Sequence, residues 1–120
     1  MKHENPFFKS TPKFEVPPEV FDRLAEFSQN PKTDQFKNIV DDLLFIYMNK
    51  NHDYGDSFGD TFKKLGIISA VTRITDKTNR LISLATKEAR VNDESIEDTL
   101  MDLANYAIMT LIELRGESDE

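Results

Sequence analysis

The chain of 120 residues contains no cysteine and no tryptophan, and it has only two histidines. Without cysteine there can be no disulfide framework, no thiolate nucleophile and no thiolate metal ligand. Two histidines alone do not supply the ligands of a usual zinc site. We therefore expect a protein of the reducing cytoplasm.

Long hydrophobic runs and a surplus of basic residues are also missing. The longest apolar run is too short for a membrane span, and the N-terminal sequence MKHENPFFKS is too polar for a signal peptide. The formal net charge of -7 excludes nucleic-acid binding through a broad basic face. A single nucleotide stays compatible with this charge, because a few local cations and bridging metal ions can hold it.

The spacing of apolar residues predicts helices, and no segment alternates as a strand would. Pro18 suits the first turn of a short helix, and Thr33 is the expected N-cap of a long one. The helices are expected over residues 18–29, 33–51, 67–87 and 92–115. The predicted fold is all-α, a compact bundle of three long helices and a short N-terminal helix. An extended arm over 1–17, a single helical domain over 18–115 and a disordered acidic tail over 116–120 complete the predicted organisation.

The last predicted helix carries acids in an apolar setting. From Leu100 to Leu114 it is apolar on nearly every side, yet Asp102 and Asn105 lie within this run. Glu94, Asp98 and Asp102 recur every four residues, so they share one stripe of the helix with Asn105. Val91 to Leu114 contains six acids and no Lys or Arg, so a cation from another segment or a metal must compensate them. Glu94 also suits the first turn of a helix, where the helix dipole stabilises acidic side chains.

Two further segments offer ligand-binding groups. The glycine-containing segment 51–66 is expected to be a structured loop, in which His52 and Tyr54 could contact a ligand or simply end a helix. On the next helix Asp76, Lys77 and Arg80 could face a phosphate and a metal ion, or form an ordinary solvated ion-pair ladder with Arg73.

Three sequence pieces, KNHDYGDSF, RITDKTNRLISL and NDESIEDTLMDLANYAIM, resemble the phage and bacterial family called nucleotide modification associated domain 1. The resemblance covers about residues 36–114. That family is itself similar to the all-α nucleoside triphosphate pyrophosphohydrolases of the MazG type, which use Mg²⁺ held by acids on adjacent helices. The resemblance implies a MazG-like fold, a nucleotide-related role and, for a phage-encoded chain, a location in the host cytoplasm.

Together these observations predict a metal-dependent nucleotide-binding protein that hydrolyses a nucleoside triphosphate, plain or modified, to release pyrophosphate. The expected cofactor is Mg²⁺ or Mn²⁺. The predicted catalytic residues are Glu94, Asp98 and Asp102; the predicted metal ligands are these three and Asp76; the predicted nucleotide-binding residues are His52, Tyr54, Lys77, Arg80, Asn105 and Tyr106.

Alternatives to an enzyme stay open. The chain lacks the E-E-x-x-E helix of the MazG type and offers only Asp41 and Asp42 at that place. A phage protein that binds or sequesters a nucleotide, or a subunit of a base-modification system, needs no turnover. A third alternative is a purely structural partner of another phage protein. The apolar faces of the last helix exceed what so small a bundle covers, so we also expect a homo-oligomer, a dimer or larger.

Overall fold

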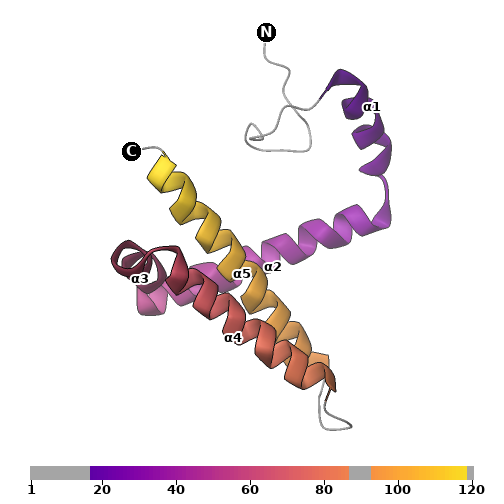
Figure 1. The fold of residues 1–120 in the computed structure, drawn as a ribbon. Helices are drawn as coiled ribbons and strands as arrows, with labels where there is room; N and C mark the ends of the chain where they lie inside the picture. Colours follow the sequence, from indigo (N-terminus) through magenta and orange to yellow (C-terminus); the bar gives the residue numbers. More distant parts are fainter. Residues whose placement is uncertain (1–16, 87–92, 119–120) are drawn as a thin grey trace. The chain divides into compact units, whose positions relative to one another are not determined.

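The computed structural model describes residues 17–86 and 93–118, and throughout these ranges the regular structure is helical (Figure 1). The elements are α1 (Pro18–Phe27), α2 (Pro31–Tyr54), α3 (Ser57–Leu65), α4 (Ile67–Thr86) and α5 (Asp93–Ser118). The all-α prediction is confirmed. None of the described helices is long and apolar enough to cross a membrane. The predicted arm falls almost entirely outside the described residues, and α5 continues three residues past its predicted end.

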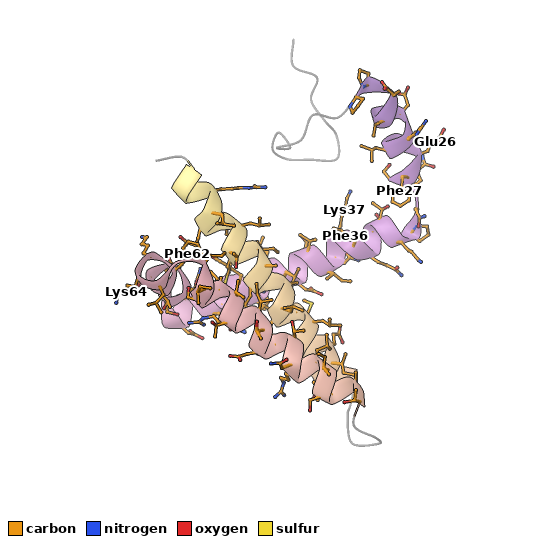
Figure 2. All side chains as sticks on the ribbon, in the orientation of Figure 1. Glu26, Phe27, Phe36, Lys37, Phe62 and Lys64 are labelled. Atoms are coloured by element: carbon orange, nitrogen blue, oxygen red, sulfur yellow. The ribbon has the colours of Figure 1, made fainter. Side chains whose placement is uncertain are left out.

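The chain separates into two compact units, Met1–Asp42 and Leu43–Glu120, with the boundary inside α2. In the first unit, α1 has proline at its first position, and the amide of Ser28 closes its last turn on the Leu24 carbonyl. Large apolar side chains of this unit, Phe27 and Phe36 among them, are exposed (Figure 2).

The start of α2 differs from the prediction. The helix begins at Pro31, and the Asn30 side chain accepts a hydrogen bond from the Lys32 amide at 2.9 Å. Thr33, the expected cap, lies in the first turn and its hydroxyl donates to the Phe27 carbonyl at 2.9 Å. Asparagine and proline together start the helix two residues early, because proline suits a position whose N–H has no helical partner.

The core of the second unit joins α3, α4 and α5. Phe58 and Phe62 of α3 pack with Ala70 of α4, and Tyr106 and Met109 of α5 lie against this cluster. Phe62, labelled on α3 in Figure 2, is only 2% exposed. Ala70 is fully buried, so α4 contributes a small side chain to this core.

Helices α4 and α5 run side by side in opposite directions (Figure 1). The contacts show the direction, since Arg73 meets Tyr106 whereas Lys77, one turn later, meets Asp102, one turn earlier. This register places Arg73 and Lys77 of α4 opposite Tyr106 and Asp102 of α5.

Segment 51–66, predicted as a loop, contains the end of α2 and a whole helix, α3. Gly55 at φ 67° ends α2, and Gly66 at φ 73° ends α3, where its amide donates to the Phe62 carbonyl at 2.7 Å. Asp56 caps α3 by accepting from the Gly59 amide at 3.1 Å. The loop prediction is wrong here, because Phe58 and Phe62, one turn apart, bury a face that stabilises even a nine-residue helix.

Candidate functional site

Asp102 of α5 links three helices of the second unit. One carboxylate oxygen accepts a hydrogen bond from the Lys50 ammonium at 3.0 Å, and the other from the Lys77 ammonium at 2.9 Å. Lys50 comes from the last part of α2 and Lys77 from the middle of α4. The Asp102 and Lys77 side chains are about one quarter exposed, whereas Lys50 is 58% exposed.

The two ammonium groups set the ionisation of this carboxyl. Burial by itself raises the pKa of Asp102, since it disfavours the charged form. The hydrogen bonds and positive charges of Lys77 and Lys50 outweigh burial and hold the pKa below its usual range. Asp102 is therefore a carboxylate at every physiological pH.

Arg73 of α4 supplies a second cationic group. Its guanidinium carbon lies 5.7 Å from the centre of the Phe58 ring and 5.9 Å from the centre of the Tyr106 ring. The two rings are themselves stacked, 6.0 Å apart at 21°. This contact with two aromatic rings stabilises the half-buried cation. Among the described residues, no hydrogen bond or ion pair involves this guanidinium, which carries five N–H donors.

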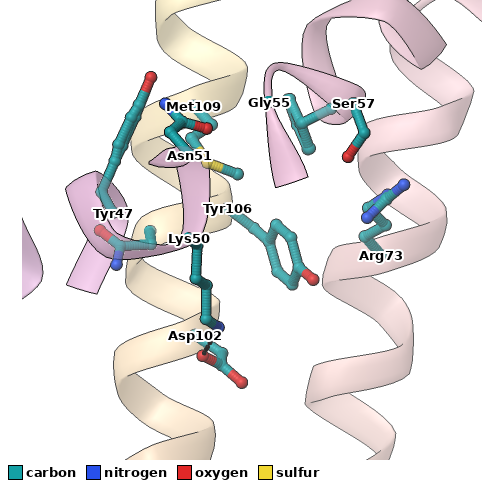
Figure 3. Close-up of a pocket in the computed structure, with 11 residues that line it drawn as sticks. Tyr47, Lys50, Asn51, Gly55, Ser57, Arg73, Asp102, Tyr106 and Met109 are labelled. Atoms are coloured by element: carbon teal, nitrogen blue, oxygen red, sulfur yellow. Dashed lines mark hydrogen bonds and ion pairs between the residues drawn. The ribbon is translucent and has the colours of Figure 1, made fainter. Parts of the chain in front are cut away.

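Asp102, Lys50, Arg73 and the two aromatic rings border one pocket of about 370 Å³ in the second unit (Figure 3). Figure 3 shows Lys50 directed at Asp102 and Arg73 facing the Tyr106 ring. Most of the polar wall comes from α2 and α5, and Phe58 and Met109 give it an apolar part. The lining residues are Tyr47, Lys50, Asn51, Gly55, Ser57, Phe58, Arg73, Asp102, Asn105, Tyr106 and Met109.

Asn105 is buried in the pocket wall and holds α5 to α2. Its amide nitrogen donates to the Leu43 carbonyl at 3.1 Å. The structure thus accounts for Asp102 and Asn105, the two polar residues that the sequence singled out in the apolar run of the last helix. Asp102 pairs with lysines, and Asn105 bonds to the backbone of another helix.

A family model described as nucleotide modification associated domain 1 matches residues 50–114, more than half of the chain. The chain belongs to this family. The matched segment contains every pocket residue except Tyr47. No curated protein and no solved structure matches the chain. The further likeness to MazG-type enzymes stays a prediction.

This member of the nucleotide modification associated domain 1 family brings some of the predicted site residues together. Asp102, Asn105 and Tyr106 line the pocket, and Lys77 joins them through its ion pair with Asp102. The other predicted residues with described side chains are exposed and do not line it: His52, Asp76, Arg80 and Asp98. The side chains of Tyr54 and Glu94 lie outside the described residues.

The His52 ring, 88% exposed, is 3.2 Å from the Asp53 carboxylate, its neighbour in the last turn of α2. This position agrees with the alternative in which His52 simply ends a helix. Asp41 and Asp42 are exposed and belong to the first unit.

The described acids of this family member do not fit a ready-made Mg²⁺ site. Among the described residues, no three His, Asp or Glu side chains come close enough together to hold a metal ion. Both Asp102 oxygens face an ammonium group, and two positive charges there oppose the approach of a cation. The predicted need for Mg²⁺ or Mn²⁺ stays a prediction.

Sequence reasoning missed Lys50 and Phe58 and did not select Arg73. The last helix has no Lys or Arg near Asp102, so a cation from another segment was expected. No local pattern, however, distinguishes Lys50 from the other lysines of the chain. Arg73 carried a usable signal, since it lies one turn before Lys77 on the same face. Its role becomes evident only when α3 supplies the Phe58 ring.

Proposed function

We propose that the pocket of the second unit binds a nucleotide through its phosphates. The observation that carries this proposal is Arg73, a half-buried guanidinium held by two aromatic rings at a pocket wall, with no described partner for its donors. Planar guanidinium donors match phosphate oxygens in pairs. Lys50 adds positive charge to the same pocket.

The remaining walls suit the nucleoside part. Tyr47 and Tyr106 offer aromatic surface on which a base can stack, and Asn51 offers an amide that can donate and accept. A pocket for inorganic anions alone has no need of these groups. The family description, which concerns nucleotide modification, agrees with a nucleotide as ligand.

Nucleoside triphosphate pyrophosphohydrolysis with Mg²⁺ or Mn²⁺ is the second candidate. Asp98 favours it, because this exposed carboxylate lies one helical turn before Asp102 at the predicted acidic stripe. Binding without turnover is the first candidate, since both carboxylate oxygens of Asp102 are already engaged by ammonium groups.

The test is calorimetric titration with nucleoside mono-, di- and triphosphates, in EDTA and in Mg²⁺ or Mn²⁺, followed by analysis for released pyrophosphate. A binder retains affinity in EDTA and leaves the nucleotide intact in every buffer. Pyrophosphate release that requires the metal would establish the enzyme instead. Absence of binding by any nucleotide under either condition would refute the proposal.

A further inference from the structure

The carboxylate of Asp102 lies where a ligand phosphate would have to be if it were to contact both Lys50 and Lys77. Each ammonium directs one donor to a different oxygen of Asp102, at 3.0 and 2.9 Å. The two oxygens thus bridge two cations from separate helices. A phosphate group presents the same feature, two oxygens on one centre that can accept from two donors.

Asp102 also changes the charge that an incoming anion meets. Lys50 and Lys77 carry two positive charges, and Asp102 removes one of them from the immediate surroundings. A ligand that reaches these lysines must either displace the carboxylate or tolerate its repulsion. Weakly charged anions gain too little from the lysines to offset this cost, whereas a pyrophosphate group gains more.

We propose that Asp102 is an internal competitor for the two lysines, which makes the pocket selective for multiply charged phosphate groups. This inference rests on the proposed function, because it concerns the same pocket. It assigns Asp102 to the lysines instead of to a metal ion. Asp102 is then a specificity-determining residue whose effect is present without any metal.

The test uses inorganic pyrophosphate as the probe, in EDTA, with the full chain and calorimetric titration. Asp102→Asn removes the competing charge while keeping the shape of the side chain. Pyrophosphate affinity should therefore rise about fivefold, which corresponds to the repulsion between two unit charges in contact in water. Acetate, a single charge, should bind measurably only to the variant. Glu97→Gln, the same loss of charge at an exposed position of α5, should change affinity less than twofold.

The outcomes separate this inference from the proposed function. Arg73→Gln should weaken pyrophosphate binding whatever Asp102 does, because the guanidinium acts independently of the ion pairs. If Arg73→Gln weakens binding but Asp102→Asn leaves it equal or weaker, the competitor role is overturned and nucleotide binding stands. If neither the wild type nor Asp102→Asn binds pyrophosphate, the competitor role is overturned, and the nucleotide titrations alone decide nucleotide binding. Asp102→Ser, which also removes the charge, replaces Asp102→Asn should that variant not fold.

Discussion

At the scale of single residues, the candidate site depends on how a charge is tolerated inside an apolar helix. The sequence shows that Asp102 needs a cation, because its own helix supplies none over more than twenty residues. The structure provides two, and one of them, Lys77, is among the residues predicted for the site. Lys50 could not be predicted, since its pairing arises from the crossing of α2 with α5 in the second unit.

Asp102→Asn should lower the melting temperature at neutral pH by a few degrees, equivalent to about 1 kcal/mol for the loss of two charge-assisted hydrogen bonds at a partly exposed site. The folded protein holds the pKa of Asp102 below its unfolded value. The stabilisation is therefore complete above the unfolded pKa of about 3.9 and is lost as the pH falls through the folded pKa.

Thermal unfolding of wild type and Asp102→Asn between pH 7 and pH 2.5 checks this sign. The difference in melting temperature should begin to close below about pH 4. A difference that persists unchanged at the lowest pH would show that Asp102 stabilises the protein by something other than its charge.

Asn105→Ala should destabilise the second unit by about 1 to 2 kcal/mol, because it removes a buried hydrogen bond and the packing of the amide. Urea denaturation measures the loss. Asn79→Ala, at an exposed position of α4, is the matched control and should be nearly neutral. Equal stability of Asn105→Ala and wild type would mean that the bond to the Leu43 carbonyl contributes nothing.

At the scale of elements, α3 shows where local sequence signals compete. The glycines of segment 51–66 indicate a loop, and the loop prediction made from them is wrong. The signals for a helix were present as well, with Asp56 before Ser57 as N-cap and Gly66 as terminator. Burial of Phe58 and Phe62 against α4 and α5 decides the competition, and that burial depends on the tertiary fold.

Gly59→Ala should destabilise α3 by about 1 to 2 kcal/mol. An added methyl group would come closer than van der Waals contact to the Asp56 and Glu113 carboxylates, so the capping carboxylate must move. Gly116→Ala is the control, because a methyl group there meets nothing within 4 Å and alanine favours helix. Equal stabilities for the two variants, measured by urea denaturation, would contradict the role of Asp56 as a cap.

At the scale of the whole molecule, the chain has more apolar side chains than the described fold buries. Among the described residues, four hydrophobic side chains are buried, namely Leu43, Phe58, Phe62 and Ala70. On α5 alone, Ile108, Leu111 and Ile112 are 43 to 52% exposed. Such a surface favours association, and the homo-oligomer expected from the sequence stays a prediction.

We therefore expect sedimentation velocity at micromolar concentration to give a mass above the 13.8 kDa of one chain. Leu111→Glu should shift the distribution towards monomer, because it places a charge in the apolar surface of α5. Asn79→Glu adds the same charge at an exposed polar position and should leave the mass unchanged. A wild type that sediments as a monomer up to high concentration would refute the prediction.

The sequence also predicts the site in part. The helical class and the polar positions Asp102 and Asn105 follow from periodicity and from the cost of burying polar groups. The sequence does not predict which cations belong to the site, because Arg73, Lys77 and Arg80 share similar spacing on one helix. Only packing against α5 and α3 distinguishes them. The structure places Arg73 in the pocket and leaves Arg80 exposed two turns away.

This difference provides the most direct test of nucleotide binding in the pocket. Arg73→Gln and Arg80→Gln remove the same charge from the same helix, and each is titrated with the nucleotide that wild type binds best. We predict that Arg73→Gln weakens binding by about tenfold to a hundredfold, the usual cost of a lost charge-assisted contact, and that Arg80→Gln stays within about twofold. Unchanged affinity in Arg73→Gln, or a loss confined to Arg80→Gln, would contradict the account.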